Sequence, residues 1–314
     1  MSNSDLYDLV IIGGGPAGFT AGLYAARSRM KTLLVERMGF GGQLLTYEKV
    51  ENYPGFPEGI STFALIELFS SQALRFGLES RNGEVAGLDL DDPIKTVRLA
   101  DGQLRARTII IATGCTPKKV GVTGEVELTG RGVSYCAVCD GPFFRDQEVA
   151  VIGGGDTAVE EAIYLTRFAA KVYLIHRRDS LRAVRVLQEQ VLRNDKIQMV
   201  WKSVVTEIHG GPQGVEALTM HNRVSGGTER LPVSGIFVFV GMNPNTGFLP
   251  SNLKLDASGF LVTDQDMACS IPGVFAAGDV RSKSLRQIAT AVGDGATAAY
   301  NAERYLEAHR GEWA

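Results

Sequence analysis

The stretch Asp8-Leu-Val-Ile-Ile-Gly-Gly-Gly-Pro-Ala-Gly18 decides how the first part of this chain folds. Its apolar half predicts a buried strand, and its glycines lie where that strand leads into a helix expected over 17–29. A second strand is expected over 32–36. Strand, helix and strand in this order predict the start of a doubly wound α/β unit with a parallel sheet.

The same pattern occurs a second time in the chain. The stretch Glu148-Val-Ala-Val-Ile-Gly-Gly-Gly-Asp-Thr-Ala158 again joins an apolar strand to a glycine cluster. A helix-like stretch over 157–169 and a strand over 171–176 follow it. The repeat predicts two copies of one architecture in tandem.

Each copy continues with a further apolar strand that ends in glycine. These strands cover 108–114 in the first copy and 235–241 in the second. Segments with alternating residues and turns precede them, over 84–107 and 197–233. Such segments predict antiparallel meanders.

A third segment begins near residue 247 and contains a strand that ends in Gly278-Asp279, followed by a helix expected over 287–308. It has no complete glycine fingerprint, so we expect it to pack onto the first copy. The predicted fold class is α/β, with two Rossmann-like three-layer (ββα) nucleotide-binding domains, the second inserted into the first. The first domain would comprise residues 1–117 and 247–314, and the second residues 118–246.

Composition excludes several classes of protein. The 32 basic and 35 acidic residues give a net charge of −3, which lacks the basic footprint of a nucleic-acid binder. Residues 9–26 carry no charge, but their many glycines and the acidic residues before them argue against a signal peptide or a membrane span. We therefore expect a cytoplasmic protein that has neither nucleic acid nor a membrane as partner.

The first glycine pattern is that of a dinucleotide site. Gly13 would make the tight turn, Gly15 would let a pyrophosphate approach the backbone, and Gly18 would let helix and strand pack closely. The N-terminus of the following helix attracts phosphate. Glu36 ends the next strand, where an acid can bind ribose hydroxyls. A non-phosphorylated ribose, as in FAD, fits this site.

The second copy reads Gly153-x-Gly155-x-x-Ala158, and its acid is replaced. The position equivalent to Glu36 is His176, and three arginines follow it: Arg177, Arg178 and Arg182. Arginines accommodate a 2′-phosphate that an acid would repel. We therefore expect NADPH here, with a hydride passing from its nicotinamide to the flavin of the first site.

The remaining motif that points to a chemical role is Cys136-Ala-Val-Cys139. A zinc site needs four ligands, and neither the other cysteines nor the four histidines have ligand spacing, so we expect no metal. Two buried structural thiols remain an alternative. Beside two redox nucleotide sites, a dithiol that cycles with its disulfide is favoured.

Asp140 follows the second cysteine directly, and two roles are open for it. It could deliver a proton to a departing thiolate. It could instead cap or form a turn with Gly141-Pro142. Cys115 and Cys269 stand alone and are interpreted as packing residues.

Together these motifs resemble the low-molecular-weight thioredoxin reductases of bacteria, nearly end to end. The segments that carry the resemblance are Gly41-Gly-Gln-Leu44, Val50-Glu-Asn-Tyr-Pro-Gly55, Cys136-Ala-Val-Cys-Asp-Gly141, Gly153-Gly-Gly-Asp-Thr-Ala158, His176-Arg-Arg-Asp179 and Ala276-Ala-Gly-Asp-Val280.

The resemblance implies a thioredoxin-disulfide reductase, a homodimer with one FAD per chain. Cys139 would face the flavin, Cys136 would attack thioredoxin, and Asp140 would donate the proton. Arg131 resembles a position at the thioredoxin-docking surface. The NADPH domain, which carries the dithiol, would rotate between two states, with hinges expected at 117–123 and 243–246.

The candidate cofactor residues follow from the motifs and the resemblance. For FAD they are Gly13, Gly15, Pro16, Ala17, Gly18, Glu36, Arg37, Gly42, Gln43, Asn52, Ala112, Thr113, Gly114, Gly278, Asp279, Arg286, Gln287, Ile288 and Ala289. For NADPH they are Gly153, Gly155, Asp156, Thr157, Ala158, His176, Arg177, Arg178 and Arg182.

Two residues depart from the family pattern. Tyr135 stands before the first cysteine, where a smaller residue is more usual, and Asp156 stands where asparagine is common and could weaken the binding of NADPH phosphates.

Two other functions compete with the main one. The chain could serve another dithiol partner, such as a glutaredoxin-like protein or a peroxidase-associated carrier, or be a nucleotide-binding regulator without turnover.

Overall fold

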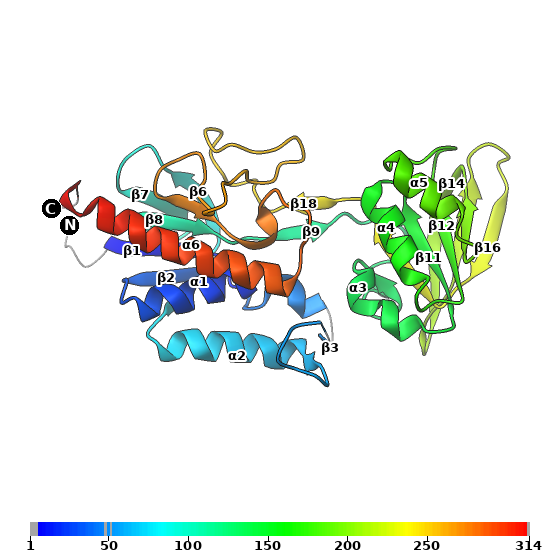
Figure 1. Ribbon diagram of the computed structural model, residues 1–314, viewed down its shortest axis with the longest axis horizontal. Coiled ribbons are helices and arrows are strands. Elements are labelled where there is room, and N and C mark those ends of the chain that lie inside the picture. Colours follow the sequence, from blue (N-terminus) through cyan, green and yellow to red (C-terminus); the bar gives the residue numbers. More distant parts are fainter. Residues whose placement is uncertain (1–5, 47–48, 51, 313–314) are drawn as a thin grey trace. The chain divides into compact units, whose positions relative to one another are not determined.

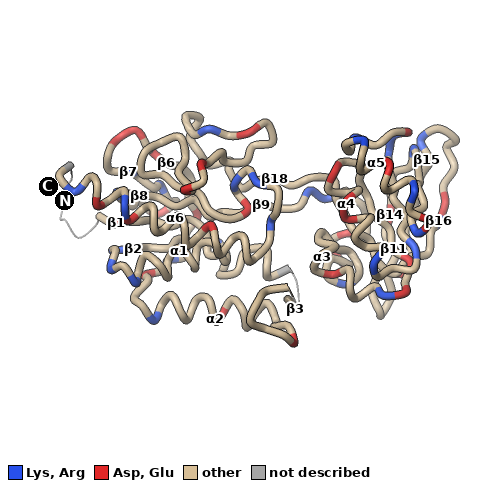
Figure 2. Tube along the Cα trace, in the orientation of Figure 1, with Lys and Arg blue, Asp and Glu red and all other residues tan. Residues whose placement is uncertain are grey.

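The computed structural model describes residues 6–46, 49–50 and 52–312 and separates the chain into two units (Figure 1). The first unit comprises Met1–Thr116 and Asn243–Ala314, and the second comprises Pro117–Met242. The chain therefore crosses between the units at 116/117 and 242/243, where the sequence suggested 117/118 and 246/247. Basic and acidic residues are interspersed along both units (Figure 2).

The first unit is built on a seven-stranded sheet in the order β5-β2-β1-β8-β7-β6, with β19 also paired to β8. Strand β8 changes neighbours along its length, because its first half pairs with β7 and residues 109–111 pair with β19. The strands are β1 (Leu6–Ile12), β2 (Thr32–Glu36), β5 (Glu79–Asn82), β6 (Val85–Asp89), β7 (Lys95–Leu99), β8 (Gly102–Ile111) and β19 (Val274–Ala276), and two residues each form β3 (Lys49–Val50) and β4 (Ile60–Ser61).

Successive side chains of β1 pack alternately on the two faces of this sheet, and both faces are buried. Leu9 and Ile11 pack into a cluster with α1 and α6, while Val10 and Ile12 pack on the opposite face among residues of β7 and β8. Helices α1 and α6 lie side by side (Figure 1), and small residues such as Ala298 let them approach closely. The helices of this unit are α1 (Pro16–Arg27), α2 (Thr62–Arg75) and α6 (Ile288–Ala308), with short 3₁₀ segments η2 (Gly42–Thr46), η4 (Gly278–Val280) and η5 (Arg310–Glu312).

The second unit has a five-stranded parallel sheet in the order β10-β17-β11-β12-β13. Helix α4 packs on one face through Ala158 and Leu165, and a three-stranded antiparallel sheet covers the other through Ile208 and Leu218. Its elements are β10 (Val133–Ser134), α3 (Ala137–Asp140), η3 (Gly141–Phe144), β11 (Glu148–Gly153), α4 (Asp156–Leu165), β12 (Lys171–Ile175), α5 (Arg185–Leu192), β13 (Ile197–Val200), β14 (Ser203–Gly211), β15 (Gly214–Asn222), β16 (Thr228–Pro232) and β17 (Gly235–Phe239).

The predicted α/β class with a helix layer, a parallel sheet and an antiparallel layer is confirmed. One detail of the meander prediction is wrong. Residues 197–200 form β13, which pairs in parallel with β12, so the meander begins only at β14. The segments that cross between the units pair with each other as β9 (Cys115–Pro117) and β18 (Met242–Pro244). Of the helices in the described residues, none is long and apolar enough to cross a membrane.

Candidate functional site

The first glycine turn is shaped by close contacts between backbone atoms. Gly13 has a φ of +113°, and a Cβ on it would collide with the backbone oxygen of Ala112. A Cβ on Gly18 would collide with the oxygen of Gly13, whereas one on Gly15 would meet nothing within 4 Å. Helix α1 starts at Pro16 without a side-chain cap, so no capping side chain accepts from the N–H groups of its first turn. An uncapped helix N-terminus beside open space is the geometry in which proteins bind anions.

Glu36 contacts this turn directly. Its Oε2 accepts a hydrogen bond of 2.7 Å from the Gly14 N–H, and its Oε1 accepts bonds from the N–H groups of Arg37 and Met38 at 2.7 and 3.1 Å. The carboxylate therefore fixes the glycine turn to the end of β2. A carboxylate has about four acceptor positions, so one remains for a ribose hydroxyl.

Asp279 is the strongest indication that the first unit holds a ligand. Its Oδ1 is buried and has no hydrogen-bond partner among the described residues. Burial raises the pKa of Asp279, and nearby Lys283 and Arg286 oppose that rise. Because a buried acceptor without a donor is costly, a polar group of a bound cofactor fits here.

A buried ion network supports the turn that carries Asp279. Asp294 on α6 pairs with Arg281 and Lys283, each at 2.8 Å, and accepts the Gly278 N–H at 3.0 Å. The exposed fractions of the three charged side chains are only 11% for Arg281, 12% for Lys283 and 13% for Asp294. Sequence patterns gave no signal for this network, because its members belong to no recognised motif.

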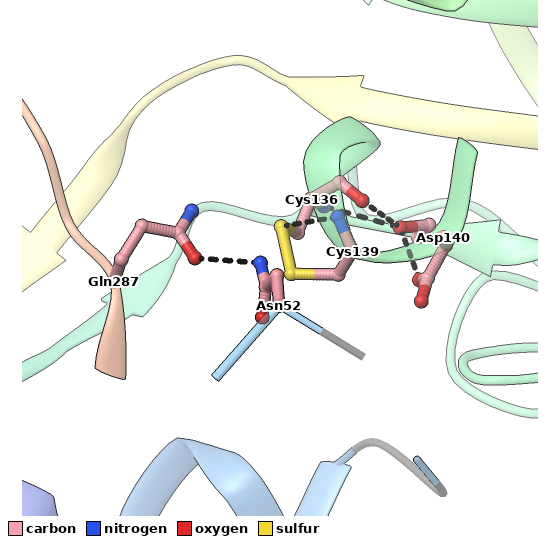
Figure 3. Close-up of a disulfide and its surroundings, with 6 residues drawn as sticks. Asn52, Cys136, Cys139, Asp140 and Gln287 are labelled. Atoms are coloured by element: carbon pink, nitrogen blue, oxygen red, sulfur yellow. Dashed lines mark hydrogen bonds between the residues drawn. A yellow bond between two sulfur atoms is a disulfide. The ribbon is translucent and has the colours of Figure 1, made fainter. Parts of the chain in front are cut away.

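The other candidate residues of the first site come from several elements of this unit. Ala112, Thr113 and Gly114 follow β8, and Gly278 packs against Ala17. The Gln43 amide donates to the Cys115 carbonyl. Asn52 donates to Gln287 at 3.2 Å, and Gln287 caps α6, whose first residues are Ile288 and Ala289 (Figure 3).

Gly42 lies next to Gly15, and Arg286 donates to the Asp279 carbonyl. The Arg37 guanidinium pairs instead with exposed Glu84. Glu51, within one of the family segments, lies outside the described residues.

The second glycine turn repeats this geometry. A Cβ on Gly153 would crowd Ala158 and lie 2.7 Å from the Phe239 oxygen, while Gly155 is open apart from Arg182 at 3.9 Å. Helix α4 begins after Gly155 without a side-chain cap. This turn therefore also presents free N–H groups at a helix N-terminus.

His176 lies beneath this turn. Its Nδ1 is 2.8 Å from the Gly153 carbonyl, and its ring occupies the space that a Cβ on Gly154 would need. Burial lowers the pKa of His176, and Arg182 and Arg178 lower it further. Its Nε2 is buried without a partner among the described residues. His176 is therefore a neutral support of the turn.

The arginines that follow β12 are exposed. The backbone of Arg182 is held at the turn, because its backbone N–H donates to the Gly154 carbonyl at 2.7 Å. Arg177 and Arg178 are exposed beside His176, and in the described part of the chain no ion pair occupies any of these three guanidinium groups. This unit thus offers cations to an anionic ligand. The expected repulsion from Asp156 is reduced, because its Oδ1 accepts the Val184 N–H at 2.7 Å.

Cys136 and Cys139 form a disulfide at the start of α3, with their Cα atoms 5.3 Å apart (Figure 3). Cys136 is the N-cap of this short helix, and its Sγ accepts the Cys139 N–H at 3.2 Å. Ser134, at the end of β10, accepts the Cys136 N–H at 3.1 Å. The pair therefore lies in a turn fixed by local hydrogen bonds. The described residues hold no group of three or more His, Cys, Asp or Glu side chains placed for a metal.

Asp140 is fixed beside this turn. The Ser134 hydroxyl donates to its Oδ2 at 2.6 Å, and its side chain makes no capping bond to the following 3₁₀ turn. Burial raises the pKa of Asp140, and the bond from Ser134 opposes the rise. Of the two roles left open by the sequence, a carboxyl that can hold a proton fits this geometry, and the side-chain cap does not.

Glu161 on α4 is a residue that sequence reasoning missed. Its Oε2 is buried without a partner in the described residues. The carboxyl group of Glu161 also interacts with the backbone of Ala137, which lies between the two cysteines. Burial raises the pKa of Glu161 to about 7, and that backbone bond opposes the rise. A glutamate on a helix gives no signal in sequence, because its burial depends on how α3 packs against α4.

Comparison with known proteins places this arrangement in one family. The model of the pyridine nucleotide-disulphide oxidoreductases matches residues 7–295. The chain belongs to this family. It is therefore an oxidoreductase, and the resemblance seen in its sequence is confirmed.

Relatives within the family match the chain over nearly its full length. A thioredoxin reductase of Peptoclostridium litorale is 47% identical, covering 96% of this chain and 98% of its own. The solved thioredoxin reductase of Streptococcus pyogenes is 48% identical with a TM-score of 0.92, covering 98% of this chain and all of its own. That of Lactococcus lactis, described as being in an FR conformation, is 46% identical with a TM-score of 0.67 over 96% and 99%.

Proposed function

We propose that this chain is an NADPH-dependent, FAD-containing thioredoxin-disulfide reductase. The observation that carries the proposal is the Cys136–Cys139 disulfide, set beside half-buried Asp140 in the unit that also contains the second glycine turn. The names of the full-length relatives support thioredoxin as the protein substrate. A homodimer in the cytoplasm is part of the same proposal.

The two glycine turns divide the cofactors between the units. The first turn and Asp279, with its buried Oδ1, would hold FAD, and the second turn with Arg177, Arg178 and Arg182 would hold NADPH and its 2′-phosphate. Residues 1–117 and 247–314 would then be the FAD domain and 118–246 the NADPH domain. Bound FAD supplies a two-electron carrier that takes hydride from NADPH and passes the electron pair to the disulfide.

The residues of the dithiol turn then act in sequence. When the disulfide receives the electron pair, its S–S bond breaks, and Asp140 gives a proton to one departing sulfur. The Cys136 thiolate attacks the thioredoxin disulfide and forms a mixed disulfide. Cys139 attacks Cys136 in turn, which restores the resting disulfide and releases thioredoxin with both of its sulfurs reduced.

Movement of the NADPH domain between the two half-reactions is also part of this proposal. The crossings pair as β9 and β18, and the Lys118 N–H donates to the Gly241 carbonyl at 2.9 Å. Two short paired segments can bend together with little change in either unit.

Replacing Cys136 with serine tests the proposal most simply. We expect NADPH to reduce the flavin of Cys136→Ser normally while thioredoxin turnover is abolished, because the attacking sulfur is lost. Cys269→Ser is the matched control, since Cys269 is a free thiol of the other unit and burial raises its pKa to about 12. Thioredoxin turnover that persists in Cys136→Ser would show that Cys136 does not attack thioredoxin.

A further inference from the structure

Glu125 is a buried carboxylate that the mechanism above does not use. Its side chain is fully buried, and its oxygens accept three hydrogen bonds. Oε1 accepts the Val120 N–H and the Tyr135 hydroxyl, each at 2.9 Å, and Oε2 accepts the Gly121 N–H at 2.7 Å. A buried carboxylate depends on such donors, so this cluster is held together as a unit.

Tyr135 connects this cluster to the dithiol. It follows β10 and directly precedes Cys136. Its ring packs against the same core cluster as Val120 and Val122. Burial and the bond to Glu125 raise the pKa of Tyr135 to about 12, so its hydroxyl stays a donor at neutral pH.

The same contacts shorten the part of the first crossing that can move. Val120 and Gly121 are bound to Glu125, and the Thr123 carbonyl accepts the Ile208 N–H at 2.9 Å. Residues 120–123, expected from sequence to belong to the hinge, are thus fastened to the body of the second unit. If this crossing bends, we therefore expect the bend at residues before 120.

We propose that Glu125 and Tyr135 are positioning residues that fasten the end of the first crossing to the residue beside Cys136. Because of this tie, displacement at the crossing moves the Cys136–Cys139 disulfide as part of one rigid body. The inference rests on the proposed function, in which this disulfide must receive electrons from the flavin. Neither residue touches the reacting atoms.

Tyr135→Phe tests the tie, because it removes one hydroxyl and keeps the ring. Tyr173→Phe is the matched control, since the Tyr173 hydroxyl also donates to a glutamate, Glu148, at 2.8 Å within the same unit. We expect amide hydrogen exchange at Val120 and Gly121 to quicken about fivefold in Tyr135→Phe only. After rapid reduction by NADPH, electron transfer from flavin to disulfide should slow about threefold or more in that variant alone.

Wild-type behaviour of Tyr135→Phe in both measurements would overturn the inference and leave the proposed function standing. Failure of the wild-type protein to reduce thioredoxin would instead overturn the proposed function, while amide exchange would still test the tie. Glu125→Gln is a second variant, in which an NH₂ group replaces one acceptor oxygen. It should quicken exchange more than Tyr135→Phe does, and if it does not fold, Tyr135→Phe decides alone.

Discussion

Ser134 donates a hydrogen bond of 2.6 Å to Asp140, and this bond fixes the carboxyl beside the redox disulfide. The same hydroxyl accepts the Cys136 N–H at 3.1 Å, so one side chain orients both the acid and the first cysteine. Burial favours the protonated carboxyl and the Ser134 bond favours the ionised one. The two effects on the pKa of Asp140 are opposed, and burial is the larger, so the pKa is raised.

Asp140→Asn should lower thioredoxin turnover about 100-fold, because the proposed proton donor to the departing sulfur is lost. Reduction of the flavin by NADPH should keep its wild-type rate, since that step does not involve Asp140. Stopped-flow absorbance for the flavin and a steady-state assay for thioredoxin separate the two. Equal loss in both steps would point to damage to the fold and not to a missing acid.

Ser134→Ala should move the pH profile of thioredoxin reduction. The Ser134 bond lowers the pKa of Asp140, so its removal raises that pKa, and the protonated acid persists to higher pH. The limb of the kcat/KM profile that reports Asp140 should therefore shift to higher pH. Ser203→Ala is the control, because Ser203 is also buried but donates only to the Trp201 carbonyl. A shift to lower pH would contradict the assignment.

Alanine substitutions at Gly15 and Gly18 should affect two different properties. We expect Gly18→Ala to lower stability and Gly15→Ala to weaken FAD binding. Gly18→Ala forces a methyl against the Gly13 oxygen, so the free energy of unfolding should fall by about 1–3 kcal/mol. Gly15→Ala meets no protein atom within 4 Å, so stability should hold while FAD is lost more readily on dialysis. Urea unfolding of the flavin-free protein and flavin release measure these effects. Tight FAD binding by Gly15→Ala would show that the cofactor does not approach this glycine.

Arg182→Gln should raise the KM for NADPH about tenfold, because a charge-assisted contact to the 2′-phosphate is lost. The KM for NADH should not change, since NADH lacks that phosphate. Arg193→Gln is the control, an exposed arginine on the surface of the same unit that pairs with Glu189 at 3.7 Å. If both nucleotides were affected equally, Arg182 would act on the glycine turn and not on the phosphate.

Local patterns in the sequence predicted much of the fold. The strands before both glycine turns and the helices after them follow from apolar runs and glycine spacing, and β2 has the predicted bounds Thr32–Glu36. The parallel placement of β13 did not follow, because a short amphipathic strand has the same pattern in either kind of sheet.

The candidate site was only partly predictable for a similar reason. The cysteines, Asp140 and the glycines belong to motifs with fixed spacing. Ser134 and Glu125 do not, because their roles arise from hydrogen bonds that form only once β10 and the first crossing are in place. Asp156 was expected to face a phosphate, yet its bond to the Val184 N–H depends on α5, which no local pattern reports.

In the proposed function, electrons pass from NADPH through this chain to thioredoxin. Its most direct test follows NADPH oxidation with DTNB as the final acceptor, with and without added thioredoxin. We expect rapid turnover that requires thioredoxin and disappears in Cys136→Ser. Equal turnover without thioredoxin, or a flavin that NADPH cannot reduce, would contradict it.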